Sequence, residues 1–149
     1  MRKLYEAVKK HKDNVFYFLH IVIDDLNQRA FSHDDTKLSK KESRLFAKYG
    51  PLLNKSAYLS KEYKANLKAM RPALIHHYTY NRHHPEYYLE HGIKSMSLVD
   101  LIEMLCDWRA ASMKHVGGNI YKSIEINQER FGYSDELKQI FINTAQRYL

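Results

Sequence analysis

The chain has 149 residues, 44% hydrophobic and 28% charged, with a formal net charge of +7. A chain of this length buries about two-thirds of the surface that its unfolded form exposes, so we expect one domain over residues 1–149 with a hydrophobic core. No apolar run approaches the roughly 20 residues that cross a bilayer, the N-terminus has no apolar signal-peptide core, and a single cysteine excludes an internal disulfide. These features predict a cytoplasmic protein without membrane contact, whose positive charge suits a polyanionic partner such as a nucleotide or a nucleic acid.

The first predicted helix runs from Leu4 to Arg29. Apolar residues between Val15 and Leu26 recur there at spacings of three and four, which is the period of one helix face. His20 lies beside this apolar stripe, where it is either a hydrogen-bonded core histidine or a ligand. We expect the helix to break over Ala30 to Ser32.

The hexapeptide Ser32-His33-Asp34-Asp35-Thr36-Lys37 follows the first helix. It offers an imidazole and a carboxylate, which are ligands of divalent metals, and an ammonium group for phosphate. Ser39 and Glu42 form a capping-box pattern that predicts a second helix, ending at Gly50-Pro51. The hexapeptide would then lie between two helix ends, where backbone amides meet an anion, or it is a polar loop in which an aspartate caps a helix.

Further along the chain, Ser60 is expected to cap a helix that begins at Lys61. The apolar pattern continues across Pro72, which predicts a kink or a new helix with this proline in its first turn. A cluster of four histidines within nine residues comes next, formed by His76, His77, His83 and His84. Each buried imidazole needs partners for two nitrogens, so the cluster favours metal or phosphate binding over a core, although a surface cluster is the alternative.

The most apolar predicted helix extends from Ser97 to His115, and Ser97 with Asp100 forms a second capping-box pattern. A carboxylate on a largely buried helix needs a cation. For Asp107 that cation is either a metal or an arginine such as Arg82 or Arg109. Ser134 begins a last amphipathic helix, and no segment alternates long enough to indicate a strand. The chain is therefore expected to be all-α, with about six helices.

Read in chain order, His20, the adjacent pair His33-Asp34 and the distant Asp107 resemble the pattern of the HD-domain superfamily of metal-dependent phosphohydrolases. The resemblance covers Phe16 to Ala111 and implies a compact single-domain helical bundle of the HD type. Members with two metals add histidines in the interval where the cluster of four falls. Lys37 matches an HD-x-x-K variant in which the lysine contacts phosphate. The strings HHYTYNRHHPEYY and EMLCDW resemble a small branch of bacterial and phage proteins, and the Gly-Tyr-Pro element of the HD-x-x-K phosphodiesterases is absent.

The resemblance implies an enzyme, a nucleotidase or phosphodiesterase that hydrolyses a phosphate ester of a nucleotide with a metal-activated water. One or two divalent ions are expected, from among Mn, Fe, Co, Mg and Zn. The expected metal ligands are His20, His33, Asp34, His77, His83, His84 and Asp107. The expected catalytic residues are Asp34, Lys37, Asp35 and Glu103. The expected substrate contacts are Lys37, Asn81, Arg82, Arg109, Asn127 and Arg130.

Two other functions fit the same residues. A basic helical protein without catalysis would bind nucleic acid, using the histidines and nearby tyrosines to stack bases beside lysine–phosphate contacts. An oxygenase-like di-iron member of the same fold would share the ligands and would be coloured and redox-active. Monomer and homodimer both remain open.

Overall fold

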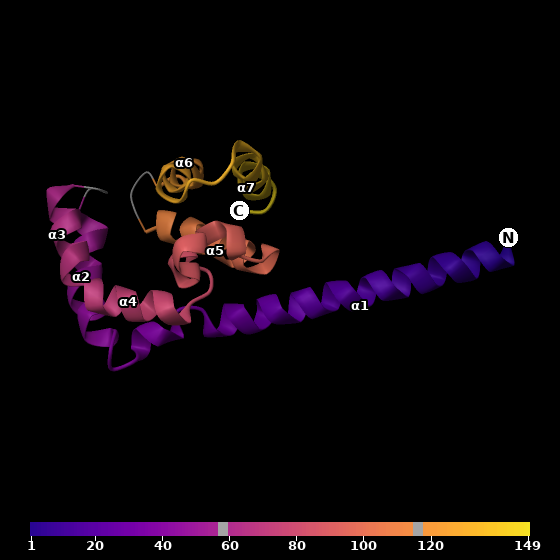
Figure 1. The fold of residues 1–149 in the computed structure, drawn as a ribbon, viewed down its shortest axis with the longest axis horizontal. Helices are drawn as coiled ribbons and strands as arrows, with labels where there is room; N and C mark the ends of the chain where they lie inside the picture. Colours follow the sequence, from indigo (N-terminus) through magenta and orange to yellow (C-terminus); the bar gives the residue numbers. More distant parts are fainter. Residues whose placement is uncertain (57–59, 115–117) are drawn as a thin grey trace. The chain divides into compact units, whose positions relative to one another are not determined.

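A computed structural model describes residues 1–56, 60–114 and 118–149, and these residues form helices and no strand (Figure 1). The all-α prediction is therefore confirmed. The described residues form seven α-helices and two 3-10 segments, η1 and η2, against the predicted number of about six helices, and the backbone of η2 is non-helical at Leu89 and Gly92. The HD type of the bundle stays a prediction. No helix in this described part of the chain combines the length and apolar character of a membrane-spanning segment.

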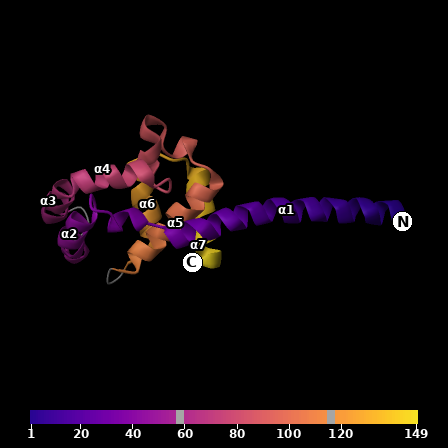
Figure 2. The same ribbon diagram turned by 90° about the horizontal axis from the view of Figure 1, so that it is seen from below.

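The chain divides into two compact units, Met1–His33 and Asp34–Leu149. That all 149 residues form one domain stays a prediction. The first unit consists of helix α1 (Arg2–Ser32), which Figure 2 shows as one uninterrupted helix. The predicted break over Ala30 to Ser32 is wrong, since these residues are helical. The Ser32 hydroxyl donates to the Gln28 carbonyl at 3.0 Å, a back-bond that a helical serine makes within its own helix.

The second unit begins with η1 (Asp35–Leu38) and helix α2 (Ser43–Lys55). The predicted capping box at the start of this helix is wrong, because Glu42 precedes the helix without capping it and its carboxylate lies against histidines of α4 instead. The predicted stop at Gly50-Pro51 is also wrong. Both residues lie inside the helix, which ends where the N–H and hydroxyl of Ser56 donate to a carbonyl one turn earlier.

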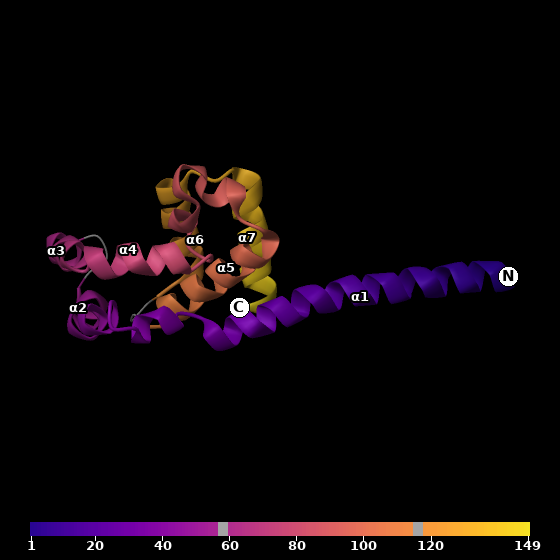
Figure 3. The same ribbon diagram turned by 60° about the horizontal axis from the view of Figure 1, so that its bottom comes forward.

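Helices α3 (Lys61–Ala69) and α4 (Arg71–Tyr80) follow, and α2 lies beside α3 (Figure 3). The Ser60 hydroxyl accepts from the Tyr63 amide at 3.1 Å, as predicted for a cap. A new helix does begin with Pro72 in its first turn, which confirms the second alternative given for this proline. Met70 separates the two helices, and the chain changes direction there (Figure 1).

The main core lies among α5 (Leu98–Ser112), α6 (Ile120–Phe131) and α7 (Asp135–Tyr148), which pack together in Figure 1. Its buried side chains are Leu101, Met104, Leu105, Ile120, Ile124, Tyr133, Phe141 and Ala145. The 3-10 helix η2 (Pro85–Ser95) connects α4 to this group of helices. A separate helical layer of α2, α3 and α4 therefore leads into a three-helix core through η2.

Side-chain caps fix the starts of two core helices. The Ser97 hydroxyl accepts from the Asp100 amide, and the Asp100 carboxylate accepts from the Ser97 amide at 2.7 Å, so the predicted capping box of α5 is confirmed. The hydroxyl of Ser134 likewise accepts from the Leu137 amide at the start of α7. The predicted end of α5 at His115 lies outside the described residues.

Candidate metal centre

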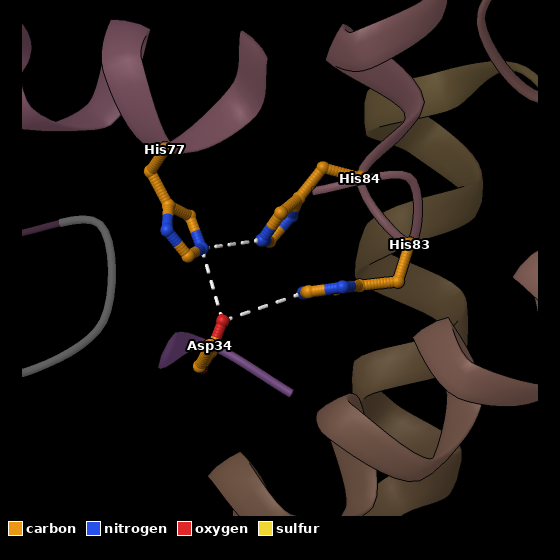
Figure 4. Close-up of side chains that lie close together, drawn as sticks. All are labelled: Asp34, His77, His83 and His84. Atoms are coloured by element: carbon orange, nitrogen blue, oxygen red, sulfur yellow. Dashed lines mark hydrogen bonds and ion pairs between the residues drawn. The ribbon is translucent and has the colours of Figure 1, made fainter. Parts of the chain in front are cut away.

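Four side chains of the Asp34–Leu149 unit converge on one point: Asp34, His77, His83 and His84 (Figure 4). Each offers one ligand atom, and these four atoms lie within 4.8 Å of one another. Asp34 precedes η1, His77 is in the last turn of α4, and the other two histidines lie between α4 and η2. Three imidazoles and one carboxylate are a ligand set that borderline divalent metals prefer. We call these four residues the histidine cluster.

The end of α4 brings the two halves of the cluster together. In a continuous helix His77 and His84 would be separated by about 10.5 Å along the axis, seven residues at 1.5 Å each. The helix ends at Tyr80, and His84 is extended with φ −98° and ψ 127°, as the following Pro85 requires. The chain therefore folds back, and the Nε2 atoms of His77 and His84 lie 3.0 Å apart.

Asp34 divides its two carboxylate oxygens between two kinds of partner. Oδ1 lies 3.1 Å from His77 Nε2 and 3.6 Å from His83 Nε2, while Oδ2 accepts from the ammonium of Lys37. The backbone of Asp34 is left-handed at φ 63°, a conformation that aspartate tolerates better than most residues. A left-handed residue held at a cluster of ligands is typical of a functional site.

A second carboxylate fixes the ring of His77. Glu42 is fully buried, and its Oε2 lies 3.0 Å from His77 Nδ1 while its Oε1 lies 2.6 Å from His76 Nδ1. A carboxylate only accepts, so the proton of neutral His77 belongs on Nδ1. The lone pair then lies on Nε2, which is the atom that faces Asp34. Carboxylates orient metal-binding histidines in this way.

A third carboxylate does the same for His83. Glu103 Oε1 lies 3.1 Å from His83 Nδ1, and both side chains are largely buried. The proton of neutral His83 therefore belongs on Nδ1 and the lone pair on Nε2. His77, in α4, and His83, in the segment after α4, thus direct their lone pairs at the same oxygen, Oδ1 of Asp34.

The electrostatics of this arrangement call for a cation. Lone pairs on two imidazoles facing a carboxylate oxygen repel one another unless a proton or a metal ion lies between them. His84 adds a third neutral ring, because burial, with the neighbouring His83 and His77 as further causes, lowers the pKa of His84 to about 3. A divalent ion bound among the four ligand atoms would relieve the repulsion.

Two other residues expected at the site lie beside the cluster. Asp107 is half-buried on α5, with a carboxylate oxygen within 4.8 Å of a His83 nitrogen, and its charge acts to raise the pKa of His84. The Lys37 side chain is about a third exposed and its ammonium lies 5.1 Å from the centre of the Phe46 ring. The role of Asp107 as a ligand stays a prediction, as does that of Lys37 as a phosphate contact.

The first unit holds two further predicted ligands. His20 donates from Nδ1 to the Phe16 carbonyl at 2.9 Å, and the two rings lie 3.8 Å apart. His33 directly follows the last residue of α1. Their contribution to a metal site stays a prediction, and Asp34 is the member of the HD-type pattern that the histidine cluster contains.

The predicted substrate contacts of the second unit are spread over several elements. Asn81 is buried and donates to the His77 carbonyl at 2.7 Å and to the Thr36 hydroxyl at 2.8 Å. Arg82 lies 3.5 Å from the Asp100 carboxylate. Asn127 is buried in α6 and donates to the carbonyl of Ser123. These side chains make contacts within the protein, and their contact with a substrate stays a prediction.

The remaining predicted residues also lie outside the histidine cluster. Arg109 donates to the carbonyl of Leu149 at 2.9 Å. The guanidinium of Arg130 lies 2.5 Å from the Glu86 carboxylate. Asp35, predicted to assist catalysis, is an exposed residue in the first turn of η1.

Sequence reasoning missed three residues that support the cluster. Glu42 was assigned to a helix cap, Thr36 had no role, and His76 was not separated from its neighbours. The Thr36 hydroxyl donates to Glu42 at 3.2 Å, which completes a network around the buried carboxylate. The number of clustered histidines is the signal that could have indicated them, because four imidazoles bound to a metal need carboxylate partners for their second nitrogens.

Comparison with known proteins gives a family and no function. A family model described as a family of unknown function matches residues 1–147, which include both units. No curated protein and no solved structure matches the chain. The chemistry of the site must therefore be argued from its own residues.

Proposed function

The chain belongs to DUF5662, a family of unknown function, and we propose from its site that it is a metal-dependent phosphohydrolase. Its substrate would be a phosphate ester of a nucleotide, either a monoester or a diester. The observation that supports this proposal is the pair of carboxylate–histidine contacts, Glu42 to His77 and Glu103 to His83, which direct two ring nitrogens at Asp34. Metal-binding histidines have such carboxylate partners as a rule.

The four members of the histidine cluster would hold the ion through Asp34 Oδ1 and one nitrogen of each ring. Three imidazoles favour Zn, Fe, Co or Mn over Mg, which prefers oxygen ligands. Asp107, close to His83, is suited to join as a further ligand. A divalent ion bound there acidifies a coordinated water and polarises a phosphoryl oxygen.

Lys37 is the residue that we propose as a phosphate contact. Its ammonium is held next to the cluster by Asp34 Oδ2, and its partial exposure leaves donors for a ligand. A cation placed there would neutralise charge that develops on the phosphoryl oxygens. We assign Glu103 the task of orienting His83, since its carboxylate contacts the Nδ1 of that ring.

The proposal is tested by the metal content of the purified protein together with the hydrolysis of a panel of nucleotide phosphomonoesters and phosphodiesters, followed by chromatography of the products. Asp34→Asn should reduce the rate of hydrolysis by more than about 100-fold. Altering a group that only orients a metal ligand costs at most about 100-fold, and the loss of a direct ligand should exceed this. His91→Gln is the matched control, because His91 is an exposed histidine of η2, and it should keep the wild-type rate.

Three results would contradict the proposal. A metal-loaded protein that hydrolyses none of these monoesters and diesters is not a phosphohydrolase of this class. Salt-dependent binding of nucleic acid without any metal requirement would favour the non-catalytic alternative. A coloured, redox-active protein would favour the di-iron alternative.

A further inference from the structure

A shallow groove of about 410 Å³ lies on the Asp34–Leu149 unit, over α3, α4 and the end of α6. The side chains that line it are Lys64, Leu67, Lys68, Arg71, Leu74, Ile75, Tyr78 and Arg130. A cavity of this size lies within the range of about 300–1,000 Å³ that small-molecule sites occupy.

The sequence itself builds one wall of the groove. From Lys64 to Tyr78 the lining residues recur at spacings of three and four, so they share one face of two successive helices. The two helices meet at Met70 at a steep angle, and the groove lies against residues of both (Figure 1). Apolar side chains and cations are therefore interleaved along a single surface.

The groove is strongly positive. Its lining contains four cations and no carboxylate. Lys64 and Lys68 are one helical turn apart, where like charges repel. Within the described ranges, neither lysine nor Arg71 makes an ion pair, whereas Arg130 is paired with Glu86 at 2.5 Å. Such a surface is complementary to an anion with more than one charge.

Tyr78 connects the groove to the histidine cluster. Its side chain lines the groove, and its ring centre lies 4.9 Å from that of His84 and 6.1 Å from that of His77. The groove therefore begins one side chain away from the cluster. A ligand bound at the cluster extends into the groove if it has a second anionic group.

We propose that this groove binds a second phosphate group of a nucleotide substrate whose scissile phosphate lies at the histidine cluster. The substrate class is then a nucleotide with at least two phosphates, and Tyr78 with the apolar side chains beside it covers the uncharged part. This inference rests on the proposed function only in taking the bound nucleotide to be hydrolysed. The groove as a phosphate site rests on its own lining.

The test compares two double variants that each remove two positive charges. Lys64→Gln with Lys68→Gln alters the groove, and Lys55→Gln with Lys61→Gln alters two exposed lysines outside its lining. The groove variant should raise the KM for a nucleoside 3′,5′-bisphosphate, which carries two phosphate esters, by about tenfold or more, because two charge-assisted contacts are lost. Its kcat, and both constants for p-nitrophenyl phosphate, should stay at the control values, since this ester has no second phosphate.

A binding measurement separates failure of this inference from failure of the proposed function. With EDTA present, the groove variant should bind the nucleoside 3′,5′-bisphosphate about tenfold more weakly than the control variant. Equal affinity of the two variants for the nucleotide overturns the inference. It is also overturned if the groove variant loses as much activity on p-nitrophenyl phosphate as on the nucleotide. If the groove variant loses affinity for single-stranded RNA but not for the nucleotide, the inference is overturned in favour of a nucleic-acid surface. If no nucleotide is hydrolysed and yet binding weakens, the phosphate site stands and the proposed activity fails.

Discussion

Replacing Glu42 with glutamine is the sharpest perturbation of the histidine cluster. The carboxylate is fully buried and accepts from His76, His77 and Thr36 at 2.6, 3.0 and 3.2 Å. Glutamine keeps the shape but has one accepting oxygen, so its amide nitrogen must face one of the two rings. When the amide nitrogen faces His77, Nδ1 of that ring must accept a hydrogen bond. The ring proton is then on Nε2, where the lone pair that binds the metal would otherwise be.

The expected loss follows from this change of tautomer. Removing an orienting partner of a metal-binding histidine costs about 10–100-fold in metal affinity. That factor corresponds to about 1.4–2.7 kcal/mol of binding free energy. The metal-free variant should also lose about 1–3 kcal/mol of unfolding free energy, because a buried donor or acceptor is left unsatisfied.

Calorimetric titration of the metal-free protein with Zn²⁺ or Co²⁺ measures the effect. Asp100→Asn is the matched control, since Asp100 is equally buried and accepts from Ser97 and Tyr88 at the cap of α5. The control should lose stability and keep its metal affinity. Unchanged affinity in the Glu42 variant, or an equal loss in both variants, would refute the assigned role of the carboxylate.

Two further predictions concern stability. Burial lowers the pKa of His84 to about 3, below the 6.5 of an unfolded histidine, so the unfolded chain binds the proton more readily. The metal-free protein should therefore lose stability as the pH falls from about 6.5 towards 3, by up to about 1.4 kcal/mol per pH unit. Urea midpoints of His84→Gln should give a flatter profile, and parallel profiles would contradict the shift. Tyr133→Phe removes a hydroxyl that donates to the Ile124 carbonyl at 2.5 Å and should cost about 1 kcal/mol in urea unfolding. The exposed control Tyr148→Phe should cost nothing measurable, and an equally stable Tyr133→Phe would show that the buried bond adds no net stability.

Local sequence signals predicted several helix boundaries. Ser60, Ser97 and Ser134 each cap the helix expected from them. Pro72 lies in the first turn of a new helix, and Pro85 keeps the preceding histidine extended. These predictions succeed because a cap or a proline acts on the backbone within one turn.

The same local signals failed where a distant partner competed for the side chain. Glu42 has the spacing of a capping box, yet it binds His76 and His77, more than thirty residues away. Pro51 has the appearance of a helix stop but lies within α2. The contacts of Glu42 are not encoded within a single turn, so reading the segment alone favoured the wrong alternative.

The sequence by itself determined that the chain is helical, where three of the helices begin, and that imidazoles and carboxylates are available for a metal. Only the tertiary structure decided which of them meet. Residues 34 and 84 are far apart in the sequence, and they become neighbours because the chain folds back after α4. The tertiary structure brought Asp34 together with His77, His83 and His84, and placed buried Glu42 and largely buried Glu103 behind two of the rings. The tautomer of each ring, and hence its capacity to bind a metal, depends on those buried carboxylates, whose partners no local pattern specifies.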